Sequence, residues 1–346
     1  MQQRDSLHHP AAGRDHGPAT VLDAVRHEVD GMDGATLFLA AGSDARALYP
    51  GAGVTLASQN SVGGALCLTF RIEHGAGPYF LLGGARIDLT WSPVETQLFE
   101  GLNTMAAVRN GETASTVAAW LNHHVQLQSL QGAVVVDRAP PVDDTEFAEN
   151  LDRAMDELGL KVPVLVLRSS VPLGKADMPA EAHPYCVPEA PGKDRMKVPP
   201  PAPWRSPLGA MSLYEILRLR FLSSARAVAN LEVHDLLPDG ARNVFDSAVE
   251  AEGGVIALFG RHCYPWRVRK DQDAQFAGGL QYLLSLLAAR LVVTLDRYCT
   301  HVFQALQVKL RIFKAVGFGA VSGYVGAIQD GAGTVYPWRH QLTRLL

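Results

Sequence analysis

The sequence has few cysteines, and its positive and negative charges nearly balance. Its four cysteines lie far apart, and none forms the Cys-x-x-Cys spacing typical of zinc sites and redox motifs. This pattern argues against a zinc site and a disulfide framework, and it favours a reducing, cytoplasmic compartment. The net charge is −4, so the chain lacks the basic excess that neutralises nucleic-acid phosphates. Nucleic acid is therefore not an expected partner.

Long uncharged apolar runs are also missing. The polar start of the chain contains no apolar stretch of the kind found in secretory signals, and we interpret residues 1–19 as a flexible tail. The apolar segment 276–316 contains Arg290, Asp296 and Arg297, which interrupt it before about 20 uncharged residues accumulate, so we expect no membrane span. We predict that residues 276–346 form a helical segment packed against the core. The alternative is peripheral contact of these helices with the inner face of a membrane, through the basic residues of 309–314.

Residues 20–98 are predicted to form a β-rich domain. They contain short apolar or alternating runs separated by glycine-rich turns, which is typical of a small sandwich or curled sheet. Half-buried strands explain these residues without any catalytic site. The predicted strands are 35–42, 54–58, 65–73, 79–84 and 85–91.

Residues 99–275 are predicted to form an α/β domain. Strand-like and helix-like segments alternate here, which predicts a mostly parallel sheet flanked by helices. The proline-rich stretch 170–207 breaks the alternation and is predicted to be a long loop that either covers a site or is disordered. The expected strands are 104–110, 132–138, 162–169, 225–233 and 255–261, and the expected helices are 112–129, 143–160, 210–224 and 242–252.

The end of the strand over 228–235 carries the most informative group of side chains. Its residues Glu232, His234 and Asp235 follow an apolar run, while Val233 is expected to point into the core. Ligands of open α/β sheets bind beyond the carboxyl ends of the strands. Acidic side chains at such a place can share one cation, which bridges diphosphate oxygens and neutralises a departing nucleoside diphosphate.

At this point the sequence resembles the GT-A glycosyltransferases of the family 2 and family 92 type, over residues 100 to 270. The segment VRNGETASTVAAWLNHH (108–124) resembles the family's first strand and helix, and Asp137 stands where the family's next strand ends in Asp. The family's DxDEF motif falls on residues 232–236. The residues matching in the first segment are Arg109, Asn110, Glu112, Trp120, Leu121, His123 and His124.

The resemblance implies a GT-A-like fold and a protein that transfers a sugar from a nucleotide-sugar donor to a glycan or surface polysaccharide acceptor. Residues Arg109, Asn110, Glu112 and Asp137 would then contact the donor, while Glu232, His234 and Asp235 would hold the metal. The motif departs from the family's pattern because Glu and His replace its two aspartates, and Arg138 stands where the family has Asn. Imidazole prefers softer ions, so Mn²⁺ is expected rather than Mg²⁺, or the metal has been lost.

Further candidates come from the residue chemistry alone. Lys193 and Arg195, in the proline-rich loop, could meet the donor diphosphate as the loop closes, or could keep an exposed loop soluble. An inverting transfer needs a base for the acceptor hydroxyl, and we favour His262, which follows the last strand, with Asp235 as a second catalytic candidate. The adjacent pair His123–His124 is not expected to bind a metal, because neighbouring helical residues point about 100° apart.

A second interpretation uses the same scaffold without catalysis. The protein would then bind carbohydrate or assist assembly, and the N-terminal β domain and the two YPWR segments would carry recognition. It predicts glycan binding without metal and without release of sugar from a donor.

Overall fold

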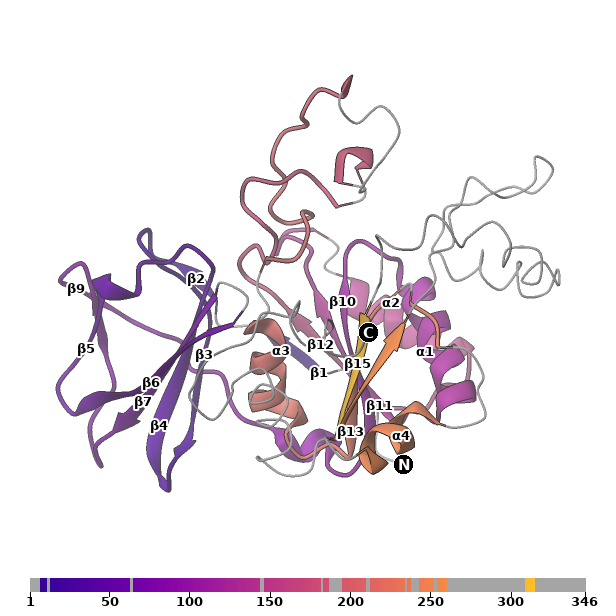
Figure 1. The fold of residues 1–346 in the computed structure, drawn as a ribbon, viewed down its shortest axis with the longest axis horizontal. Helices are drawn as coiled ribbons and strands as arrows, with labels where there is room; N and C mark the ends of the chain where they lie inside the picture. The colour runs from indigo at the N-terminus through magenta and orange to yellow at the C-terminus, as the bar shows by residue number, and fades with distance from the viewer. Residues whose placement is uncertain are drawn as a thin grey trace.

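The structure, a computed structural model, describes residues 7–10, 13–62, 65–143, 146–181, 183–186, 195–209, 212–233, 235–237, 243–251, 254–259 and 309–314. Within these residues the chain forms a seven-stranded, a five-stranded and a three-stranded sheet (Figure 1). None of the helices in these segments is long and apolar enough to cross a membrane.

The large sheet confirms the predicted parallel α/β architecture. Its four central strands are parallel and lie in the spatial order β12, β11, β10, β13. The order reverses between β10 and β13, since the first strand of this group along the chain lies beside the fourth. The bounds are β10 (Asn103–Arg109), β11 (Gly132–Asp137), β12 (Val164–Arg168) and β13 (Ala227–Glu232).

Helices cover both faces of this sheet because successive strand residues point to opposite sides. Met105 and Ala107 pack in the core beneath α1, α2 and α4, whereas Ala106 packs in the core beneath α3. The bounds are α1 (Ala114–Gln128), α2 (Phe147–Glu157), α4 (Val244–Glu250) and α3 (Ser212–Leu217), and α3 continues into a π-helical turn, η5 (Arg218–Leu222). Helix α1 begins after Thr113, whose side chain accepts a hydrogen bond from the Thr116 amide. The predicted helices thus form, although each is shorter than expected.

The two outer parts of the large sheet differ from the sequence predictions. Strand β1 (Leu7–Pro10), from the segment interpreted as a flexible tail, pairs in parallel with β12. Pairing at a sheet edge uses backbone groups, so the polar composition of this segment gave no signal. Strand β15 (Lys309–Lys314) was predicted to be helical, but it lies antiparallel between β13 and β14 (Val255–Phe259). Its sequence, KLRIFK, starts with alternating basic and apolar residues, which is the two-residue period of a strand. The rest of the predicted helical segment lies outside the described residues.

The N-terminal region is β-rich, as predicted. Its five-stranded sheet has the order β2-β3-β4-β7-β6, and a three-stranded sheet has the order β5-β8-β9. Strand β3 was not predicted, because its five consecutive buried residues obscure the alternation. The bounds are β2 (Arg14–Asp15), β3 (Thr20–Val29), β4 (Met32–Leu39), β5 (Leu48–Pro50), β6 (Val54–Val62), β7 (Ala65–Ile72), β8 (Phe80–Leu82) and β9 (Ala85–Ile87), with short helical turns at Ala45–Ala47, Thr96–Phe99 and Pro184–Cys186.

One face of the five-stranded sheet packs on α3 and η5, beside the large sheet (Figure 1). Val25, Phe38 and Cys67 share a core with residues of α3. The same junction contains a fully buried ion pair, in which Arg220 Nη1 lies 3.0 Å from Asp23 Oδ2. The other oxygen of Asp23 accepts a hydrogen bond from the Ser92 hydroxyl at 2.6 Å. The β-rich region is therefore joined to the α/β domain by apolar packing and by a neutralised charge pair.

Candidate functional site

The carboxyl ends of the four parallel strands carry a row of charged side chains. Arg109, Asp137 and Arg168 are the last residues of β10, β11 and β12, and they are adjacent in register. Glu232 ends β13 on the other side of β10. The strand interiors are almost entirely apolar, so charge appears only where the strands emerge from the core. The row spans the point between β10 and β13 where the strand order reverses, which is where open α/β sheets bind ligands.

Asp137 joins two arginines at the floor of this row. Its Oδ1 lies 2.9 Å from Arg109 Nη1, and its Oδ2 lies 3.9 Å from Arg168 Nε. The side chains of Arg109 and Asp137 are 5% and 2% exposed, and the Arg109 guanidinium also stacks on Phe147 at 3.8 Å from the ring centroid. The structure thus brings together two residues predicted to bind the donor, and it places them as a buried pair beneath the surface of the site.

The loop after β10 brings two more predicted residues into the same place. The Asn110 amide donates to Glu112 Oε2 at 2.5 Å, and Arg109 Nε donates to the Glu112 carbonyl at 2.6 Å. Asn110 Nδ2 donates to Glu181 Oε2 at 3.0 Å. Gly111, at φ 98°, makes the turn with a backbone conformation that other residues rarely adopt. The segment 109–112 is therefore a tight, internally bonded loop at the rim of the site.

Arg138 and Glu181 are site residues that the sequence analysis did not propose. The Arg138 side chain is 3% exposed, its Nη1 lies 3.6 Å from Glu181 Oε2, and its Nη2 donates to the Ser206 carbonyl. Burial lowers the pKa of Arg138, while the charges of Glu181, Glu232 and Glu112 raise it. Acidic residues from three separate segments therefore surround one guanidinium. The position of Arg138, directly after a buried strand, was the signal available for it, whereas Glu181 lies in an aperiodic loop.

Glu232 ends β13 and Asp235 follows it at the carboxyl edge of the sheet, and Val233 between them is buried. Glu232 is exposed, and Asp235 is partly buried. The Asp235 carboxylate accepts a hydrogen bond from the Glu232 amide at 3.1 Å, while the Asp235 amide donates to the Glu232 carbonyl at 2.9 Å. These bonds close a turn directly after β13. In the part of the chain that the structure describes, no three His, Cys, Asp or Glu side chains form a group able to hold a metal ion.

Helix α1 fixes the position of this turn. Trp120 Nε1 donates to the Asp235 carbonyl at 2.9 Å, and His123 Nε2 donates to the Leu237 carbonyl at 2.7 Å. The Leu237 amide donates to His124 Nε2 at 3.2 Å, so the proton of His124 is on Nδ1, which donates to the Trp120 carbonyl at 2.9 Å. Both histidines thus bind backbone, and the Trp-Leu-x-His-His pattern positions the acidic strand end.

The role of His124 predicts a pH-dependent stability. Burial lowers the pKa of His124 to about 3 from 6.5, so the unfolded chain binds the proton more readily than the folded one. The stabilising contribution is complete above pH 6.5 and is lost as the pH falls towards 3. Between pH 7.5 and pH 5 we expect a loss of about 2 kcal/mol from this residue in the free energy of unfolding. Urea unfolding at both pH values should show a smaller loss in His124→Gln than in wild type. The assignment is contradicted if His124→Gln loses as much unfolding free energy between pH 7.5 and pH 5 as wild type does. It is also contradicted if the control His123→Gln reduces the loss by the same amount.

The remaining predicted site residues are not part of this arrangement. Lys193, His234 and His262 lie outside the described residues. Arg195 is exposed, and within the described segments it makes no hydrogen bond or ion pair. Among its described residues, the long loop contributes to the site through Glu181 near its start and the Ser206 carbonyl at its end.

Comparison with known proteins adds no relative: no family model matches the chain, and no curated protein matches it either. The chemistry of the site therefore rests on its own geometry. A row of guanidinium and carboxylate groups at a sheet's carboxyl edge can bind a polyanion that carries a cation, because each ligand charge meets an opposite fixed charge.

Proposed function

We propose that the protein is a glycosyltransferase-like enzyme that uses a nucleotide-sugar donor, with the site at the carboxyl edge of β10, β11 and β13. The main support is the charged row at the point where the strand order reverses, with Glu232 exposed at its rim. The resemblance of residues 100–270 to the GT-A glycosyltransferases supports the same location. The separated cysteines fit a cytoplasmic enzyme.

In this proposal the buried charged residues orient their neighbours, and the exposed charged residues contact the nucleotide-sugar donor. Asp137 holds Arg109 through a 2.9 Å contact and lies 3.9 Å from Arg168, whose Nη2 donates to the Pro140 carbonyl and whose side chain, 23% exposed, would face a diphosphate at the surface of the site. Glu232, with Asp235 and His234, would hold Mn²⁺, which neutralises the charge of the nucleoside diphosphate as it leaves. Arg138 supplies a fixed positive charge beside the same carboxylates. His262 or Asp235 would accept the proton of the acceptor hydroxyl, and the glycan acceptor is the expected second substrate.

The first test is a thermal shift with nucleoside diphosphates. Uridine diphosphate with Mn²⁺ should raise the melting temperature, because a ligand present at 100 times its Kd stabilises the folded state by about 2.7 kcal/mol. For a chain of this size, the shift is about 4 °C. Glu232→Gln should lose most of the shift, since it removes a charge at the rim without changing side-chain volume.

Glu157→Gln is the matched control, because Glu157 is exposed near the end of α2, away from the row. It should keep the full shift. If no combination of nucleotide and Mn²⁺ changes the melting temperature of the wild type, the donor site is not where we propose it.

Donor turnover separates the enzyme from the interpretation without catalysis. An active transferase should release nucleoside diphosphate slowly from its nucleotide sugar, even when water replaces the acceptor. A protein that only binds carbohydrate should capture glycans equally with and without EDTA and should release no nucleotide product. The second result would assign the scaffold to recognition.

A further inference from the structure

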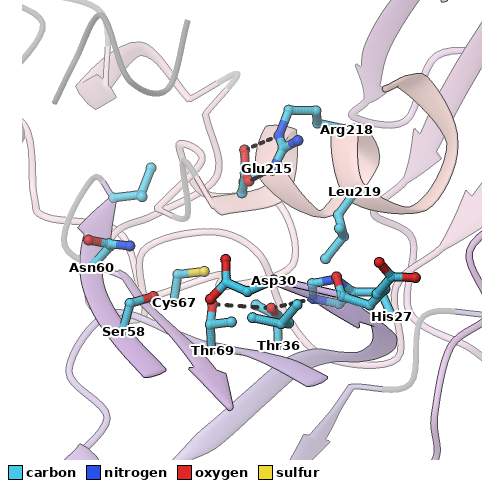
Figure 2. A pocket seen from close by; sticks show the side chains of 13 residues that line it. His27, Asp30, Thr36, Ser58, Asn60, Cys67, Thr69, Glu215, Arg218 and Leu219 are labelled. Atoms are coloured by element: carbon cyan, nitrogen blue, oxygen red, sulfur yellow. Dashed lines mark hydrogen bonds and ion pairs between the residues drawn. The ribbon is translucent and has the colours of Figure 1, made fainter. Parts of the chain in front are cut away.

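A cavity of about 540 Å³ lies between the five-stranded sheet and the helical segment α3–η5, away from the charged row. Figure 2 shows strand residues on one side of it and α3 residues on the other. Its volume is within the range of roughly 300–1,000 Å³ that is usual for small-molecule sites, and such sites favour domain junctions. Its polar lining includes His27, Thr36, Ser58, Asn60, Thr69, Glu215 and Arg218.

The sheet side of the cavity is formed by polar residues on the same face of the five-stranded sheet whose apolar residues pack on α3. Thr36, Thr69 and Ser58 are register neighbours on β4, β7 and β6, so their side chains form one row across the sheet. In the next row of this face, Asn60 is paired with Cys67, which belongs to the core under α3. Packing on α3 therefore ends where the hydroxyl row begins.

The hydrogen bonds along this row all point the same way, because each hydroxyl donates to the next acceptor. His27 Nδ1 lies 2.8 Å from the Glu28 carbonyl and must donate to it, so His27 Nε2 accepts from the Thr36 hydroxyl at 2.8 Å. Thr36 Oγ1 then accepts from the Thr69 hydroxyl at 3.3 Å. Lone pairs on Thr69 Oγ1 remain available to a ligand donor, and Ser58 and Asn60 add donors and acceptors beside it.

The helix side supplies a charged pair with zero net charge. Arg218 donates from Nε to Glu215 Oε2 at 2.8 Å, and a second bond joins Arg218 Nη2 to Glu215 Oε1. These side chains are 7% and 11% exposed, and they face the strand residues across the cavity (Figure 2). A bidentate pair offers both a carboxylate edge and a guanidinium edge to a ligand that has donors and acceptors side by side.

The lining has no excess positive charge for an anion and no thiolate for a metal. Burial lowers the pKa of His27, and the Arg218 charge lowers it further, so this imidazole is neutral at pH 7. Burial raises the pKa of the Cys67 thiol to about 12, so no thiolate is present to bind a metal. Glu28 and Asp30 also line the cavity, and Asp30 pairs with Arg71, so the lining carries no excess positive charge that would attract an anion. A neutral ligand with many hydroxyl groups matches the remaining lining, because each hydroxyl both donates and accepts.

We propose that this cavity binds a neutral sugar unit, and that the N-terminal β domain is thereby a carbohydrate-binding module joined to the α/β domain. The site needs neither metal nor nucleotide and does not depend on the proposed transferase activity. If both sites function, the cavity holds a sugar of the acceptor at a distance from the reacting hydroxyl.

Titration of the full-length protein with neutral monosaccharides and their methyl glycosides, followed by calorimetry or ligand-observed NMR, tests the proposal. At least one of glucose, galactose, mannose or N-acetylglucosamine should bind with a Kd on the order of millimolar, unchanged by EDTA. Asn60→Leu should abolish measurable binding because it replaces the amide donors and acceptor of the cavity wall with a bulkier apolar side chain. Thr69→Val should raise the Kd about three- to tenfold, since it removes one hydroxyl at constant volume.

Ser61→Ala is the matched control. Ser61 is on the same strand as Ser58 and Asn60, but it is exposed and does not line the cavity. It should bind the sugar as wild type does. The proposal is overturned if no neutral sugar binds at tens of millimolar, if inorganic phosphate binds more tightly than any sugar, or if Asn60→Leu and Ser61→Ala affect binding equally. Loss of the nucleotide-dependent thermal shift leaves these outcomes unaffected, so failures of the two proposals are distinguishable.

Discussion

Replacing Asp23 by Asn should destabilise the folded protein by about 3–5 kcal/mol, because it leaves the Arg220 guanidinium buried without its counter-charge. Both side chains are almost completely buried, and their 3.0 Å contact lies at the junction of the β-rich region and the α/β domain. The Ser92 hydroxyl, which donates to Asp23, loses a charged acceptor as well. Urea unfolding followed by circular dichroism and tryptophan fluorescence measures the change.

A double-mutant cycle provides the control for this prediction. Asp23→Leu combined with Arg220→Met removes both charges at similar volume, and it should be more stable than either single variant. Arg26→Met is a surface control, because the ion pair of Arg26 with Asp33 is more than 40% exposed on both sides. It should change stability by no more than about 1 kcal/mol. Equal losses in Asp23→Asn and Arg26→Met would show that the buried pair does not hold the junction.

Patterns of local sequence were enough to predict the central α/β sheet. Runs such as GAVVVD and VPVLVLRS are too apolar for an exposed strand, and the amphipathic segments between them fix the alternation. Neither β1 nor β15 was predicted: the polar segment of β1 joins the sheet only by pairing with β12, and the short basic–apolar alternation of β15 lies within a longer apolar segment that was interpreted as helical. Local patterns also missed β3, since consecutive buried residues on a strand that packs on both faces show no alternation.

The part of the candidate site that lies at the ends of the strands could be predicted from the sequence. Asp137, Arg109 and Glu232 each follow an apolar run, so their convergence follows from parallel strands that meet at one edge. The roles of Glu181 and Arg138 depend on how a long loop folds back, which spacing does not encode. The cavity under α3 was equally hidden, because its lining comes from four strands and a helix far apart in the chain.

Replacing Asp137 by Asn should affect both stability and ligand binding, unlike the change at Asp23. Arg109 and Arg168 lie on either side of this carboxylate, and the Ala139 amide donates to it at 3.0 Å. Without its charge, Arg109 stays buried and loses the Asp137 counter-charge, while Arg168, whose Nη2 still donates to the Pro140 carbonyl at 3.0 Å, loses the carboxylate that lies 3.9 Å from its Nε. We expect a loss of about 3–5 kcal/mol in the free energy of unfolding. We also expect the Kd for uridine diphosphate with Mn²⁺ to rise about ten- to a hundredfold, equivalent to the loss of one or two charge-assisted hydrogen bonds.

Asp23→Asn is the appropriate comparison for this effect, since it removes a buried carboxylate of similar energetic weight far from the charged row. Calorimetric titration at a temperature where both variants are fully folded should give a wild-type Kd for Asp23→Asn and a raised Kd for Asp137→Asn. That difference would mean that Asp137 orients the groups that meet the diphosphate. If both variants bind as wild type does, Asp137 only stabilises the sheet edge, and the donor must lie nearer to Glu232 and Arg138 than to Arg168.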